Sequence, residues 1–290
     1  MTEPVRRVAV LGPGGERAAE ATAGDVDVYP RDVNARSGDV RTEDSRNDED
    51  ARTDADLVTA VEETDARVSS LRHADAIVAM GERAVSAAAT AEVSAPILPV
   101  GVGRLGVDRP HAGDAIRALV AGRWRRTVHP LCSVTIGRDR STRHRSALDV
   151  TLLPRETARI SEYAVSFPSG RSESFRSDGV VVATPLGSGG YADAAGAPAL
   201  EPGSGLSITP IAPFRIHCDR WVAAERVTLS IERDEEPIEL TVDGTVCGTV
   251  PPHEPIAVAV EDRFDLISMP AEGEGDGAAD WKNSNESCTE

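Results

Sequence analysis

The stretch from Asp178 to Tyr191 has the clearest capacity for chemistry. Val180–Val182 is a short β-branched run, which predicts a buried strand. A turn of small residues follows, and its breakers of regular structure are Pro185, Gly187, Gly189 and Gly190. Glycine lets a backbone approach a ligand closely, so the turn could hold a phosphate or a ribose. Glycine spacing alone is weak evidence, and the residues by themselves favour an ordinary glycine-rich loop.

The composition restricts the partners of this chain. Its 290 residues include 48 acidic and 31 basic ones, the formal net charge is -17, and Lys282 is the only lysine. An acidic surface repels nucleic acid and anionic membranes, so we expect neither as a partner. Acidity spread along an arginine-using, aromatic-poor chain is typical of a protein from a salt-loving cytoplasm, where counter-ions screen self-repulsion.

The cysteines and the apolar runs favour the same setting. Cys132, Cys218, Cys247 and Cys288 have no CxxC spacing, so neither a zinc site nor a disulfide framework is indicated. No apolar run approaches the ~20 residues that span a bilayer, and no signal-like segment precedes the first expected strand. We therefore expect a protein of the reduced cytoplasm.

Hydrophobic patterns divide the chain into two halves. In residues 1–122, expected strands at 7–12, 74–79 and 96–100 alternate with helical patterns, which predicts a doubly wound α/β domain with a parallel sheet. Residues 31–57 are polar and acidic, and are expected to form a disordered insertion. Residues 123–270 carry short alternating runs and an Asp243-Gly244 hairpin turn, which predict an antiparallel β-sandwich domain. Residues 271–290 are expected to be an acidic, disordered tail.

Several segments together resemble NAD kinases. Asp178–Tyr191 is similar to the family's DG…STPTGSTAY signature, and Ala195–Pro198 and Ile208–Pro213 stand where the family carries AGGP and TPI.P. Gly103–Gly106 is similar to the GRLG of VNxGRLGF, and Val242–Gly244 to the VDG of a late hairpin. The resemblance covers most of residues 5–270. It implies an α/β domain, then a β domain, with the site in the cleft between them.

The family's GGDGT motif is altered in this chain. It aligns with Met80–Ala84, where one glycine remains. The resemblance implies that Glu82 is the base that activates the ribose 2′-hydroxyl, and that Gly81 and Arg83 contact phosphate. Glutamate adds a methylene to the family's aspartate, a displacement of about 1 Å that can slow a reaction ~100-fold. Glu82 and Arg83 fit a solvated helix start equally well, because the helix dipole favours a carboxylate in the first turn.

The family's Asn-Glu pair, which holds the adenosine of NAD, aligns with Asp149-Val150. Asp149 can accept ribose protons, whereas the Val150 side chain cannot hydrogen-bond. As plain strand residues both also fit a period-2 pattern without a ligand. The NAD-binding residues implied by the resemblance are Asp149, Asp178, Thr184, Gly187, Ser188, Gly189, Gly190 and Tyr191.

The predicted function is phosphorylation of the 2′-hydroxyl of NAD to give NADP, from ATP or polyphosphate, with Mg²⁺ implied by the family and a homo-oligomer expected. The alternative is a catalytically impaired relative that binds NAD(P)(H) as a sensor or regulatory subunit. The histidines show no metal-ligand spacing, and Ser188 lacks the G-x-S-x-G elbow. The Arg138–Arg145 run could dock polyphosphate, but the charge pattern favours a solvated, salt-bridged hairpin loop.

Overall fold

We describe a computed structural model of the chain, which covers residues 5–12, 56–138, 142–156, 160–215, 219–234 and 236–270. The expected tail at 271–290, and residues 31–55 of the expected insertion, lie outside these ranges. Residues 56–62 are helical, and Leu57 is buried in a hydrophobic core. Leu57 therefore belongs to the folded body rather than to an insertion.

A parallel sheet forms the first half. Its four strands lie in the order β2-β1-β3-β4, and their bounds are β1 Arg7–Leu11, β2 Arg67–Val68, β3 Ala76–Met80 and β4 Ile97–Val100. The helical elements between and after them are η1 Leu71–His73, α2 Glu82–Thr90, η2 Arg109–His111 and α3 Ala112–Val120. All residues of β3 are buried, as expected for a strand covered on both faces.

Helices cover both faces of this sheet. Val8 and Val10 of β1 pack with residues of α3 and of the 56–62 helix, whereas Ala9 and Leu11 pack with residues of α2. Alternate residues of a strand point to opposite faces, so each strand serves two cores. The doubly wound α/β arrangement is confirmed.

The second half is a sandwich of two sheets. One sheet has the order β12-β11-β10-β7-β14-β15, and the other carries β13, β8 and β9 beyond β16. The strand bounds are β6 Thr142–Ser146, β7 Asp149–Pro154, β8 Ser161–Ser166, β9 Ser172–Ser177, β10 Gly179–Ala183, β11 Leu206–Ile211, β12 Trp221–Ala223, β13 Arg226–Arg233, β14 Ile238–Val242 and β15 Thr245–Val250. One core of apolar side chains from both sheets fills the space between them. The predicted antiparallel sandwich is confirmed.

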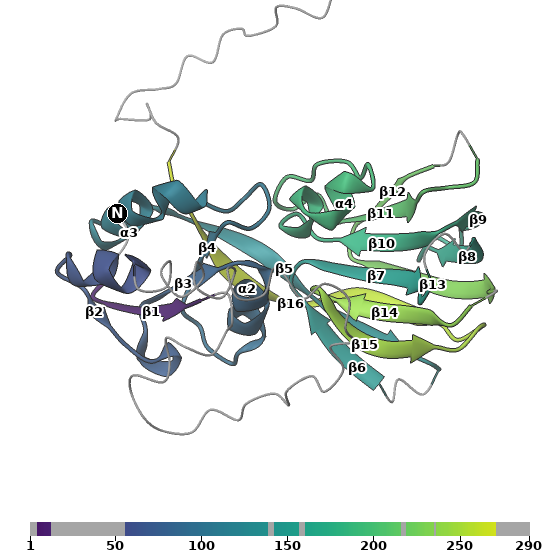
Figure 1. The fold of residues 1–290 in the computed structure, drawn as a ribbon, viewed down its shortest axis with the longest axis horizontal. Coiled ribbons are helices and arrows are strands. Elements are labelled where there is room, and N and C mark those ends of the chain that lie inside the picture. Colours follow the sequence, from purple (N-terminus) through teal and green to yellow (C-terminus); the bar gives the residue numbers. More distant parts are fainter. Residues whose placement is uncertain are drawn as a thin grey trace, which may run out of the picture.

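Two long strands join the halves. β5 (Arg125–Ile136) and β16 (Ile256–Ser268) pair along their whole length, and Leu266 of β16 pairs in parallel with Ile97 of β4. Figure 1 shows this ribbon of teal and yellow strands running from the α/β half on the left into the sandwich on the right. The sheet is continuous, so a domain border near residue 122 stays a prediction.

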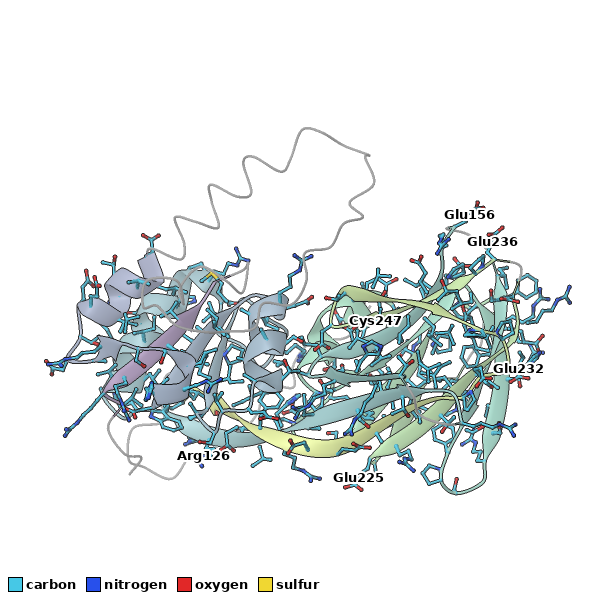
Figure 2. All side chains as sticks on the ribbon, turned by 90° about the horizontal axis from the view of Figure 1, so that it is seen from below. Arg126, Glu156, Glu225, Glu232, Glu236 and Cys247 are labelled. Atoms are coloured by element: carbon cyan, nitrogen blue, oxygen red, sulfur yellow. The ribbon has the colours of Figure 1, made fainter. Side chains whose placement is uncertain are left out.

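Charged residues gather on the outside of the sandwich. Glu156, Glu225 and Glu232 lie on its surface in Figure 2. In the arginine-rich run, Arg143 pairs with Glu261 and Arg145 pairs with Asp262. Both arginines lie on β6, next to the hairpin between β5 and β6. The pairs agree with the salt-bridged interpretation of that run.

Candidate functional site

The turn after β10 is held in shape by its own hydroxyl groups. Thr184 Oγ1 donates to the carbonyl of Ala147 at 2.8 Å, and Ser188 Oγ donates to the carbonyl of Pro185 at 2.7 Å and accepts from the amide of Leu200 at 3.1 Å. Thr184 and Ser188 are buried. These hydroxyls position the turn, and contact with NAD stays a prediction for both residues.

Two glycines let the turn pack tightly against other protein backbone. A β-carbon at Gly187 would lie 2.3 Å from the carbonyl oxygen of Leu148, and one at Gly189 would lie 2.8 Å from the amide nitrogen of Arg104. Gly103 is equally close to the turn, since a β-carbon there would lie 2.2 Å from the carbonyl oxygen of Leu186. The GRLG stretch and the turn thus form one unit. Their glycines are needed for protein packing even without a ligand.

Gly190 faces the N-terminus of helix α2. A β-carbon at Gly190 would lie 3.2 Å from Oε1 of Glu82. Gly81, before Glu82, has a φ of +83°, a conformation that side chains disfavour, and it caps α2. The structure therefore brings together Glu82 and the 184–191 turn, although about a hundred residues separate them in the sequence.

The remaining positions of the Met80–Ala84 loop differ in environment. Met80 is fully buried among residues of the α/β core, and Ala84 is fully buried against the opposite face of the sheet. Arg83 is exposed, and it has no ion pair among the described residues. Only Gly81, Glu82 and Arg83 are accessible to a ligand.

Asp149 lies at the start of β7, next to this loop in space. It is 8% exposed, and burial raises the pKa of its carboxyl from 3.8 to about 7, with the charges of Asp243 and Glu82 adding to the effect. Thr151 donates to Asp149 Oδ1 at 3.3 Å. Val150, its neighbour, is buried in the sandwich core and faces away from the site, as the period-2 pattern predicts. Asp149 is thus a partly neutral carboxyl at neutral pH.

Asp243 organises this region, and the sequence indicated it only as a hairpin residue within a family-like VDG stretch. Its carboxylate accepts hydrogen bonds from Ser86 Oγ at 2.6 Å, from Ser146 Oγ at 2.8 Å and from three successive backbone amides, those of Ala147, Leu148 and Asp149 at 2.9, 2.9 and 3.1 Å. Asp243 and Gly244 have φ angles of +47° and +75°, as a two-residue hairpin turn requires. One buried carboxylate thus ties α2, the start of β7 and the β14–β15 hairpin together.

His129 supports the turn from the other side. Its Nε2 accepts from the amide of Leu186 at 3.0 Å, and its Nδ1 lies 2.9 Å from the carbonyl oxygen of Pro130, to which it donates. Burial lowers the pKa of His129 to about 4, so the ring is neutral. A ring that donates through one nitrogen and accepts through the other is the neutral tautomer that this arrangement needs. No metal-ligand spacing marks such a histidine in the sequence.

Tyr191 and Asp178 complete the set of predicted residues. Tyr191 is 45% exposed, and its pKa is raised by burial and then by the charges of Asp149 and Asp178. Asp178 precedes β10 and Thr184 follows it, so their backbones lie roughly 20 Å apart at ~3.3 Å per residue. The length of β10 therefore separates Asp178 from Thr184, but Asp178 lies close enough to Tyr191 for its charge to act on the tyrosine.

Comparison with known proteins now identifies the family. Residues 149–263 match the ATP-NAD kinase C-terminal domain. The NAD kinase of Koribacter versatilis is 31% identical over 192 residues, which cover 62% of this chain and 67% of that protein. The chain belongs to the NAD kinase family. The NAD kinase of Methanopyrus kandleri is 32% identical over 162 residues, which cover 53% of this chain and 58% of that protein.

Solved structures of NAD kinases share the fold. A yeast NADH kinase complexed with NADH superposes with a TM-score of 0.60 at 14% identity, covering 93% of this chain and 85% of that chain. An NAD kinase from Archaeoglobus fulgidus in complex with ATP gives 0.55 at 21% identity, covering 92% and 94%. In sequence, the chain spans 58% and 56% of the first two curated NAD kinases that it matches.

Proposed function

We propose that this NAD kinase family member phosphorylates the 2′-hydroxyl of the adenosine ribose of NAD, with Glu82 as the base. The convergence of Glu82 with the 184–191 turn carries the proposal, because a β-carbon at Gly190 would lie 3.2 Å from the carboxylate of Glu82. Asp149 and Tyr191 lie near them, since the charge of Glu82 acts on Asp149 and the charge of Asp149 acts on Tyr191. A dinucleotide held by Asp149 and Tyr191 would present its ribose to Glu82.

In the proposed step, the 2′-oxygen attacks the terminal phosphorus of the donor, and the bond from that phosphorus to the leaving phosphate oxygen breaks. Glu82 accepts the proton of the hydroxyl, and NADP and ADP, or a shortened polyphosphate, are the products. Arg83 is exposed beside Glu82 and can contact the donor phosphates. Phosphoryl transfer depends on positioning and charge stabilisation more than on covalent chemistry from the protein, so a small number of well-placed groups suffices.

The donor atoms of this region fit Mg²⁺ that arrives with phosphate. Within the described ranges, no group of three or more His, Cys, Asp or Glu side chains could hold a metal by itself. Mg²⁺ usually keeps water and substrate phosphates as ligands and takes one or two carboxylates from the protein. Glu82 and Asp149 can offer such carboxylates, and a bound Mg²⁺ would neutralise charge on the phosphate chain.

A second candidate function is binding of NAD(P)(H) without turnover. It is favoured by Met80 and Arg83, which replace two glycines of GGDGT. Met80 is anchored in the core, and Arg83 adds a long side chain where the family backbone is bare. In this alternative, Asp149, Tyr191 and the turn bind the dinucleotide, and the altered loop prevents transfer.

The experiment that separates these functions is a product assay. Purified protein in molar KCl is incubated with NAD or NADH, Mg²⁺ and either ATP or polyphosphate, and NADP(H) is measured with an NADP-specific dehydrogenase. We expect NADP(H) with at least one donor. Absence of product together with calorimetric binding of NAD(P)(H) would favour the second candidate, and absence of both would contradict the two functions.

The setting of the protein is also proposed from its composition. None of the helices in the described part of the chain has the length and apolar character needed to cross a bilayer. Cys132, a buried residue of β5, is a free thiol. A cytoplasmic location, adaptation to salt and assembly into a homo-oligomer stay predictions.

A further inference from the structure

A cavity of about 1340 Å³ opens at the amino ends of the parallel strands. Glu82 lies beyond the carboxyl end of β3, at the other end of the strands. Arg7 begins β1, Asp75 precedes β3 and Pro96 precedes β4. The lining residues that carry its chemistry are Arg6, Arg7, Arg67, Arg126, Asp75 and Trp124. Ligands of doubly wound folds bind at the carboxyl ends of the strands, where Glu82 lies. The function proposed above therefore does not use this cavity.

The cavity wall is positively charged in a protein whose net charge is -17. Four arginines line it against two aspartates. Arg7 is paired with Asp75 at 2.6 Å, and Arg126 is paired with Asp265 at 3.2 Å. Arg6 and Arg67 are exposed and have no ion pair among the described residues. Two guanidinium groups are therefore available to an anion.

Trp124 adds an aromatic side chain to this wall. The residue is 8% exposed, and its Nε1–H has no partner within the described part of the chain. The Nε1 atom is itself buried, so Trp124 offers a ligand in the cavity its ring rather than this N–H. Figure 2 shows Arg126, two residues further along, at the lower edge of the α/β half.

We propose that this cavity is a second binding site for a ligand that carries a phosphate chain. Arginine forks match the oxygens of phosphate and form charge-assisted hydrogen bonds with them. The volume is ample for a di- or triphosphate, because small-molecule pockets commonly measure about 300–1,000 Å³. Trp124 immediately precedes β5, and His129 lies within this strand. The ring of His129 accepts a hydrogen bond from the amide of Leu186 in the turn. A ligand here would contact an element that supports the candidate active site.

The site is tested by calorimetry with inorganic tripolyphosphate in 0.5 M KCl. We expect saturable binding to the wild type, weakened about tenfold in Arg67→Gln and in Arg6→Gln, since each removes one charge-assisted contact. The matched control is Arg226→Gln, an exposed arginine of β13 in the sandwich, which should bind as the wild type does. Circular dichroism of each variant establishes that it is folded.

Two further arms separate this site from the candidate active site. Gly190→Val fills the space beside Glu82 and should leave tripolyphosphate binding to the cavity unchanged. Repeating the titration with ATP and with NADP distinguishes a free phosphate chain from a nucleotide as the ligand. No saturable binding of any of the three by the wild type would overturn the proposal. Equal losses in Arg67→Gln and Arg226→Gln would also overturn it, because they would indicate a general charge effect.

Discussion

Replacing Asp149 by asparagine isolates the free energy of burying its charge. The pKa of this carboxyl is raised from 3.8 to about 7 in the folded protein, first by burial and then by Asp243 and Glu82. Because the folded state holds the proton more tightly than the unfolded chain, Asp149 contributes stability below pH 4 that is lost as the pH rises toward 7. Asparagine has no such proton, and its amide oxygen can still accept from Thr151.

The magnitude follows from the two pKa values. A difference of about 3 units, at about 1.4 kcal/mol per unit, amounts to about 4 kcal/mol. The free energy of unfolding of Asp149→Asn relative to the wild type should therefore rise by several kcal/mol between pH 4 and pH 7.5. Above that pH the difference should be constant.

The assay is denaturant unfolding in molar KCl at pH intervals from 4 to 8.5, with circular dichroism as the readout. The matched control is Asp193→Asn, which makes the same exchange on the exposed surface of α4 (Tyr191–Ala194). Surface substitutions usually change stability by less than ~0.5 kcal/mol, so the control should follow the wild type at every pH. A difference between Asp149→Asn and the wild type that stays flat from pH 4 to 8.5 would refute the burial argument.

Three other predictions concern the supports of the site and the surface. Burial lowers the pKa of His129 from 6.5 to about 4, so only the unfolded chain gains the proton as the pH falls from 7 to 4, and the free energy of unfolding should fall by about 3 kcal/mol. Unfolding in the Asp149→Asn background measures this fall, and His129→Gln should remove it. Ser86→Ala removes the 2.6 Å hydrogen bond to Asp243 and should lower the free energy of unfolding by about 1–3 kcal/mol. The control, Ser166→Ala on the exposed face of β8, should change it little, and equal effects in the two variants would contradict the role given to Asp243. The excess of acidic residues predicts a melting temperature that rises from 0.1 to 3 M KCl in a thermal scan, and a flat or falling curve would be evidence against salt adaptation.

Local patterns were sufficient to predict much of the fold. The runs at Arg7–Leu11, Ala76–Met80 and Ile97–Val100 are short, apolar and separated by helical patterns, and the structure places them in one parallel sheet. The period-2 pattern of β7 and β14 predicted two sandwich strands, whose alternate residues fill one core. Such patterns report which face of an element is buried, and this is enough to establish the layers.

The links between the halves could not be predicted in this way. The second half of β16 contains charged residues, among them Glu261, Asp262 and Arg263, and it remains a strand because it pairs with β5 throughout. Asp243 bonds to Ser86 and His129 bonds to Leu186, which are 157 and 57 residues away in the sequence. Periodicity carries no information about such partners. For Asp243, the similarity of Val242–Gly244 to a family motif was the only sequence evidence of a wider role.

The most direct test of the proposed function is Glu82→Gln, compared with Glu92→Gln just beyond the other end of α2. If Glu82 is the base, NADP formation should be abolished in Glu82→Gln, whereas the calorimetric affinity for NAD should stay close to that of the wild type, because only an interaction of the transition state is removed. Glu92→Gln should retain full turnover. Rapid NADP formation that survives Glu82→Gln would contradict the assignment of this site.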